Sequence, residues 1–200
     1  MKKIILIMIL TLNNLTYSQQ EENKIDSLVT EFTSELKLKG VNDFFSVKIF
    51  CVGGTKIVFP NECDSFYETY LFWRINNKSF IKKFDTCKNY RQIDITETKI
   101  IESFIESKDN LKNEIVKKYT TIENGGNSTV LETDHSCFRM FQFQTENDSF
   151  INKFDLFDLT TDSADKNLYY ESNNKLRLVE LSKMCDKLIS KIENGRQFEH

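Results

Sequence analysis

The chain has 200 residues, of which 27 are basic and 30 acidic, so its formal net charge is -3. Because an acidic chain of this kind is not drawn to phosphate backbones, we expect no nucleic-acid partner. Hydrophobic residues make up 40% of the chain, and 17 residues are Phe. This content is enough to form the hydrophobic core of one domain of ordinary size.

The N-terminus has the layout of a bacterial-type export signal. Two lysines precede the apolar run 4–10, and small residues follow up to Ser18. We predict a signal peptide over 1–18 and a single mature domain over 19–200, located in the periplasm or outside the cell. Loss of the two lysines leaves 25 basic against 30 acidic residues, a net charge of about -5. The run 4–10 is too short to span a bilayer and no later stretch approaches about 18 apolar residues, so no membrane-embedded segment is predicted after signal removal.

Apolar residues at helical spacing predict a first helix over 21–39, ending at Gly40. Alternation then predicts an antiparallel hairpin of 45–51 and 55–59, turned at Gly53-Gly54. The remaining single elements that the patterns predict are a strand at 91–95, a helix at 97–119 capped by Thr96, strands at 129–132, 137–145 and 168–171, and a helix at 175–193 followed by a frayed tail.

An internal repeat is the most distinctive feature of the sequence. NKSFIKKFD at 77–85 returns as NDSFINKFD at 147–155, with seven of nine positions identical at an offset of 70. We interpret it as a duplicated β-hairpin, one copy in each of two pseudo-repeat halves, about 41–123 and about 128–195. Two-residue turns are predicted at Asn77-Lys78 and Asn147-Asp148, because Asn tolerates the left-handed conformation of such turns.

The predicted register separates apolar from charged side chains in both copies. One face collects Leu71, Trp73, Ile75, Phe80 and Phe84, matched by Phe141, Phe143, Phe150 and Phe154. The opposite, outward face has Arg74, Lys83 and Asp85, matched by Gln144, Lys153 and Asp155. In the first copy this second face also carries Tyr70, Phe72 and Ile81, a candidate partner surface; the alternative is that a helix covers them. The predicted class is α+β: an antiparallel sheet built from the duplicated β-hairpin unit, with three amphipathic helices packed on one face.

All five cysteines lie in the part of the chain that is predicted to be exported, where disulfides can form, and their odd number leaves at least one unpaired. Cys63 and Cys87 bracket the first repeated hairpin, so we predict a disulfide between them. Cys51 and Cys185 continue apolar patterns and are predicted to be buried thiols.

The only cluster of reactive groups is Asp134-His135-Ser136-Cys137. On a strand His135 and Cys137 would share a face, where they could act as base and nucleophile or as two metal ligands. Two ligands are too few for a zinc site, and the other histidine of the sequence is the terminal His200. We therefore interpret His135 and Cys137 as structural residues and keep a catalytic or metal-binding role as the alternative. Four acidic residues at 155, 158, 162 and 165 lack the spacing of a calcium loop and are interpreted as solvated. No phosphate loop, dinucleotide fingerprint or Cys-x-x-Cys occurs, so no cofactor is predicted.

These patterns name no reaction. We expect a non-enzymatic binding or structural module whose partner is an unknown protein or envelope component. The alternative is a small hydrolase or metal-dependent enzyme centred on His135 and Cys137. A third hypothesis is an inhibitor or immunity-type partner protein, which a large exposed aromatic patch would support.

Overall fold

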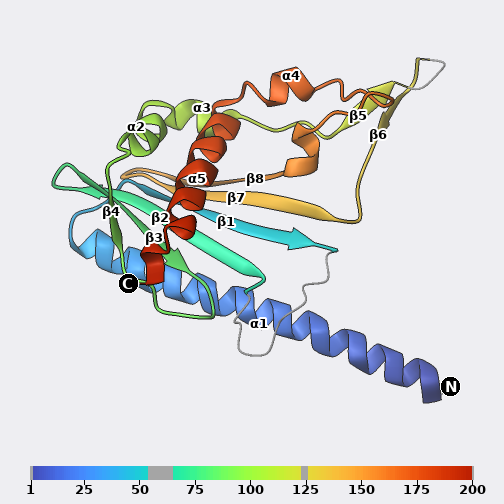
Figure 1. The fold of residues 1–200 in the computed structure, drawn as a ribbon, viewed down its shortest axis with the longest axis horizontal. Coiled ribbons are helices and arrows are strands. Elements are labelled where there is room, and N and C mark those ends of the chain that lie inside the picture. The colour runs from blue at the N-terminus through green and yellow to red at the C-terminus, as the bar shows by residue number, and fades with distance from the viewer. Residues whose placement is uncertain (1, 54–64, 123–125, 200) are drawn as a thin grey trace.

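A six-stranded antiparallel sheet forms the framework of the computed structural model, which describes residues 2–53, 65–122 and 126–199, with backbone only for 2–18 and 199. The strand order is β4-β3-β2-β1-β7-β8, and helices pack on the sheet (Figure 1). The α+β prediction is therefore confirmed. The strands of this sheet are β1 Phe44–Val52, β2 Tyr67–Ile75, β3 Lys78–Phe84, β4 Ile93–Ile95, β7 Ser136–Gln144 and β8 Ser149–Asp155; β5 Thr120–Ile122 and β6 Ser128–Val130 form a separate pair.

Helices cover both faces of the sheet, whereas the sequence predicts them on one (Figure 1). Because alternate strand residues point to opposite sides, Phe44 and Trp73 pack with α1, while Phe45 and Phe72 pack in the second core with α2 and α5. The central strands are apolar at successive positions, so both of their faces need cover. The helices are α1 Lys2–Leu38, α2 Lys99–Glu106, α3 Lys108–Asn113, α4 Tyr170–Asn173 and α5 Arg177–Asn194, with short 3-10 turns η1 Leu156–Leu159 and η2 Gln197–Glu199.

Gly40 ends α1, as the sequence predicts. It takes a φ of +80°, and the amides of Gly40 and Val41 donate to the carbonyls of Lys37 and Leu36 at 2.9 and 3.0 Å. This pair of bonds is the Schellman arrangement, which satisfies carbonyls at the end of a helix. The chain then turns directly into β1.

Both repeated hairpins have the same pairing: Trp73 faces Phe80 in the first, and Phe143 faces Phe150 in the second. The first turn lies at Asn76-Asn77, with φ of 50° and 61°, and the ladder places the second at 146–147. Each turn lies one residue earlier than predicted. A turn displaced by one residue moves the pairing by two, so every side chain keeps its predicted face within the hairpin.

The two hairpins nevertheless present their equivalent residues to opposite sides of the sheet. Trp73 pairs with Phe44 of β1, whereas its counterpart Phe143 pairs with the next residue, Phe45. Because a one-residue difference in register reverses the face, the hairpins are related by a half-turn about β1. The aromatic face of the first copy therefore packs under α1, and that of the second packs under α2 and α5.

Tertiary contacts account for three elements that differ from the sequence prediction. The helix predicted over 97–119 is divided into α2 and α3, and the residue at its N-cap is Thr98 and not Thr96. It ends at Asn113, where Glu114 leaves the helix and its carboxylate accepts hydrogen bonds from the first amides of α5, at 3.0 and 2.8 Å. The strand predicted at 168–171 is the entry to α4. Up to Phe198 the predicted frayed tail is packed on the domain, since Phe198 is buried against Tyr70 and Tyr90. The predicted return strand 55–59 lies outside the described residues.

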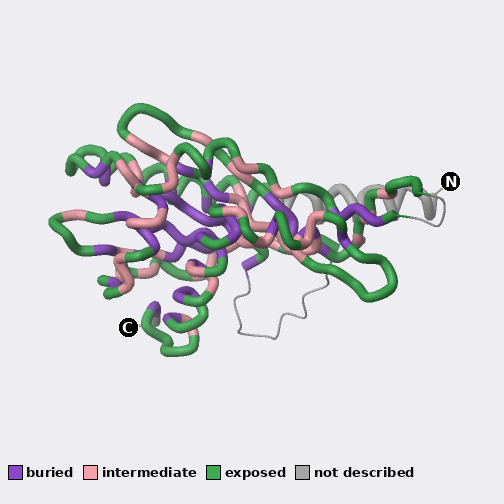
Figure 2. Tube along the Cα trace, turned by 90° about the horizontal axis from the view of Figure 1, so that it is seen from above, coloured by how far each residue is buried: buried purple, intermediate pink, exposed green. Residues whose placement is uncertain are grey.

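The buried residues concentrate in the central strands and on the inner faces of α1 and α5, and the connecting loops are mostly exposed (Figure 2). Strands from both predicted halves share this one sheet.

Candidate functional site

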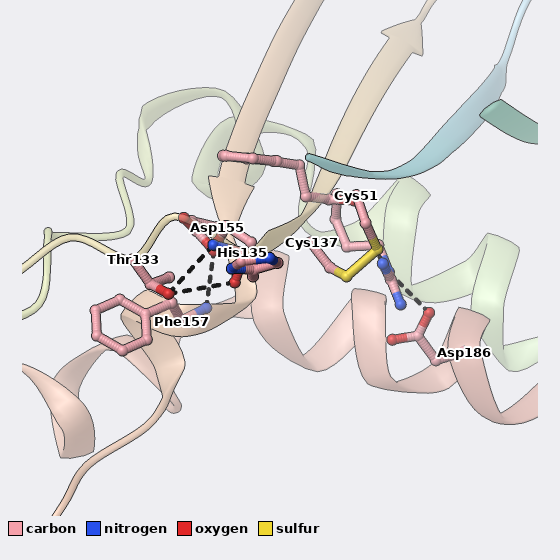
Figure 3. Close-up of a disulfide and its surroundings, with 10 residues drawn as sticks. Cys51, Thr133, His135, Cys137, Asp155, Phe157 and Asp186 are labelled. Carbon is pink, nitrogen blue, oxygen red and sulfur yellow. Dashed lines mark hydrogen bonds and ion pairs between the residues drawn. A yellow bond between two sulfur atoms is a disulfide. The ribbon is translucent and has the colours of Figure 1, made fainter. Parts of the chain in front are cut away.

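The cluster around His135 does not assemble a reactive site. Cys137 lies in β7 directly opposite Cys51 of β1, and the two form a disulfide (Figure 3). His135 is exposed just before β7, and its main-chain N–H donates to the Thr133 hydroxyl at 3.4 Å. A sulfur in a disulfide is neither a thiolate nucleophile nor a metal ligand, so Cys137 fills neither role while this bond is formed.

The disulfide also corrects the prediction for Cys51, which is exposed and bonded and is not a buried thiol. The alternation of β1 continues past the part of the strand that helices cover, so its last residues reach solvent. Cys185 is a buried free thiol as predicted, and burial, assisted by the charge of Asp186, raises its pKa well above the ordinary value. Cys87 is disulfide-bonded, but Cys63 lies outside the described residues, so their pairing stays a prediction.

The predicted partner surface is wrong, because Tyr70, Phe72 and Ile81 are almost completely buried. They belong to the core beneath α2 and α5. The alternative interpretation, in which a helix covers this face, holds.

Two of the four acidic residues that the sequence places at solvated positions are buried. Asp155 accepts hydrogen bonds from the Ser136 hydroxyl and, at 2.9 Å, from the amide of Phe157. Asp158 accepts from the amide of Tyr119 at 2.8 Å. These carboxylates hold turns together, and along the described ranges no cluster of three or more histidine, cysteine or acidic side chains could hold a metal ion.

A buried ionic network lies where β2 and β3 meet the end of α5. The ammonium of Lys83 is 2.8 Å from Glu68, 2.9 Å from Glu193 and 3.7 Å from Asp85. Lys83 and Asp85 are therefore not outward-facing as predicted, because α5 and the chain end close over this face. Burial alone would lower the pKa of Lys83, but hydrogen bonds and charges from Glu68 and Glu193 outweigh it and raise that pKa.

Two tyrosine hydroxyls complete the network. Tyr70 donates to Glu193 and Tyr90 donates to Asp85, both at 2.8 Å. Burial first, and then the neighbouring carboxylates, raise the pKa of both phenols. Since each charged or polar group here has a partner within the protein, the network is a structural element and offers no free acid or base.

A groove of about 490 Å³, here named the α1 groove, lies between α1 and the segment 82–90 that leads out of β3. This volume is in the range of small-ligand sites, about 300 to 1,000 Å³. Its apolar lining comes from Leu28, Phe32, Phe84 and Tyr90. The remaining lining residues are Lys24, Glu31, Glu35, Lys82, Lys83, Asp85, Thr86, Cys87, Lys88 and Asn89.

Lys82 lies on the α1 side of β3, because it alternates with Lys83 along the strand. Its ammonium is 5.3 and 5.4 Å from the ring centres of Phe32 and Phe84. It donates to the carbonyl of Tyr90 and, at 3.4 Å, to the side chain of Asn89. Burial lowers its pKa and the more distant charge of Glu35 opposes that shift in part.

Sequence reasoning missed both the network and the α1 groove, since their residues come from segments far apart in the chain. One signal was present: adjacent lysines on a strand must point to opposite faces. Because both faces of the sheet are covered, Lys82 and Lys83 each enter a partly closed environment.

Comparison with known proteins gives no further guidance, since no family model, curated protein or solved structure matches the chain. No helix in the described ranges has the length and apolar character that crossing a membrane requires.

Proposed function

We propose that this protein is an exported, non-enzymatic binding module and that the α1 groove is its ligand site. The observation that carries the proposal is the lining of the groove, where ring faces of Phe32 and Phe84 lie beside the ammonium of Lys82. Concave sites that combine apolar walls with a few fixed polar groups are typical of ligand binding.

The disulfide between Cys51 and Cys137 supports export, because such bonds persist mainly in the periplasm, the extracellular space and other oxidising compartments. The predicted signal peptide over 1–18 agrees with that location. Export to the periplasm or beyond remains part of the proposal.

The state of the candidate reactive groups supports a binding role over catalysis. Cys137 is bonded to Cys51, Cys185 is fully buried, and Lys83 is held by carboxylates. A nucleophile needs an adjacent base and access to substrate, and neither cysteine nor Lys83 has both.

The experiment is a fragment screen of residues 19–200, followed through the amide signals of the labelled protein in two-dimensional NMR spectra. We expect fragments that bind to shift signals of α1 around Leu28 and of the segment 82–90. Leu28→Glu should weaken these fragments at least about tenfold, equivalent to about 1.4 kcal/mol, because it places a charge against the apolar wall.

The matched control is Leu38→Glu, which introduces the same charge on α1 at an exposed position outside the lining. It should leave fragment affinity unchanged. Absence of any fragment at the groove, or equal binding to Leu28→Glu and the parent protein, would refute the groove as the ligand site.

A further inference from the structure

We propose that the α1 groove binds a carboxylate carried on an apolar group, with the Lys82 ammonium as its anchor. This inference rests on the proposed function and specifies the ligand class of the same site.

The ammonium of Lys82 has more hydrogen-bond donors than it has acceptors around it. A lysine ammonium has three N–H donors. Two have acceptors, the carbonyl of Tyr90 and the amide oxygen of Asn89, and both acceptors are neutral. Lys83, by contrast, is surrounded by Glu68, Asp85 and Glu193. Lys82 therefore keeps one donor at the groove, and the carboxylate whose charge acts on it, that of Glu35, lies beyond ion-pair distance.

The second step is the charge of the groove. The charged and titratable side chains that line it are Lys24, Glu31 and Glu35 from α1, and Lys82, Lys83, Asp85, Lys88 and Tyr90 from the segment 82–90. Lys83, Asp85 and Tyr90 belong to the buried network, and the remaining groups are three lysines and two glutamates. This balance attracts an anion, and the two glutamates disfavour a dianion such as a phosphate monoester. A monoanionic carboxylate fits both conditions.

The third step concerns the apolar part of the ligand. Phe32 and Phe84 flank the ammonium of Lys82, and partial burial of this side chain lowers its pKa. An apolar group packed along Leu28 and Phe32 would complete this desolvation, while its carboxylate restores a charged partner to the lysine. Charge-assisted hydrogen bonds in such surroundings are stronger than the same bonds in water.

The test uses two probes of the same shape, 3-phenylpropionate and 3-phenylpropionamide, titrated into residues 19–200 and followed by NMR. The carboxylate should bind at least about tenfold more tightly than the amide, since only the carboxylate forms a charge-assisted hydrogen bond with both partners ionised. Lys82→Met should remove this preference, and Lys82→Arg should retain part of it. Lys39→Met, which removes an exposed lysine outside the lining of the groove, should change the affinity by less than about threefold, as expected of a solvent-screened charge.

The affinity should also fall at alkaline pH, because only the protonated Lys82 offers a charge. Since the pKa of Lys82 is lowered, this loss begins at a lower pH than an ordinary lysine would give, and Lys82→Met abolishes it. Spectra of each variant outside the groove verify that it is folded.

Two further probes distinguish the source of the carboxylate. The peptide Gly-Gly-Phe with a free C-terminus, compared with its C-terminal amide, represents the end of a polypeptide, whereas 3-phenylpropionate represents a small organic acid. Tighter binding of either carboxylate supports the proposal and identifies the source. Fragments that bind the groove with equal affinity for acid and amide would overturn this inference and leave the proposed function standing, whereas no groove binding at all would overturn both.

Discussion

Gly53, the residue after β1, lies where the backbone passes very close to the backbone of Asp134. Its φ is +77°, and a Cβ built on it would lie 1.8 Å from the carbonyl oxygen of Asp134. The contact lies at the end of the sheet that carries the disulfide between Cys51 and Cys137. Gly53 is thus constrained both by its left-handed conformation and by space.

Gly53→Ala and Gly40→Ala separate these two constraints. Gly40 has a φ of +80° but no atom within 4 Å of its Cβ position, so its substitution should cost only the conformational penalty of about 1 to 2 kcal/mol. Gly53→Ala should cost more than about 3 kcal/mol, since the backbone of Asp134 must also move. Urea unfolding of both variants measures the difference. Equal losses would mean that the segment before β7 yields without cost.

Asp85 and Asp155, the last residues of the two copies of the repeat, have the same structural role. The repeat correctly places Asp85 and Asp155 at the ends of the two hairpins. In the structure, each carboxylate accepts hydrogen bonds from amides of the turn that follows, namely those of Cys87, Lys88 and Phe157. Their burial could not be predicted, because the groups that cover them come from distant elements.

At the scale of the element, local pattern predicted more than long-range pairing did. Alternation within 67–85 and 138–155 gives the faces of each hairpin correctly, because it depends only on neighbours in the sequence. Which face meets α1 depends on how Trp73 and Phe143 pair with β1. Nothing local specifies that one-residue difference, so the half-turn between the copies could not be predicted.

Truncation of two stacked rings tests the placement of the second hairpin. Phe143 is fully buried and its ring centre lies 4.7 Å from that of Phe150, which is partly exposed on the edge strand β8. Phe143→Ala should lower the free energy of unfolding by about 3 to 5 kcal/mol, as a core cavity does. Phe150→Ala should lower it by about 1 to 2 kcal/mol, because less apolar area is lost from the interior. Denaturant unfolding decides, and similar losses would contradict an edge position for Phe150.

For the whole molecule, the candidate site was the least predictable part. Composition and periodicity predict an α+β domain, yet the α1 groove joins the first helix to residues about fifty positions later in the chain. The pairing of Cys51 with Cys137 likewise depends on β1 and β7 lying side by side. Cysteine spacing alone cannot give connectivity, and the apolar alternation that predicts a buried thiol at Cys51 carries no information about β7.

The buried network ties β2, β3 and α5 together and should control stability at alkaline pH. Folding raises the pKa of Lys83, Tyr70 and Tyr90, so all three hold their protons to higher pH in the folded chain than in the unfolded one. In the unfolded chain they release protons near their ordinary values of about 10. Above that pH the folded state binds more protons than the unfolded state, and stability must fall as pH rises.

We therefore expect the contribution of these three groups to be fully present below about pH 9 and to decrease above about pH 10, by about 1.4 kcal/mol per pH unit for each proton that only the folded state retains. Tyr70→Phe lowers the overall stability by removing the hydrogen bond to Glu193, but its distinctive effect is a shallower decline with pH, since one of the three protons is gone. Tyr170→Phe, a partly exposed tyrosine of α4 outside the network, should keep the parent slope. Unfolding in urea between pH 8 and pH 11 gives the slopes, and an unchanged slope in Tyr70→Phe would show that the phenol ionises in the folded chain as easily as in the unfolded one.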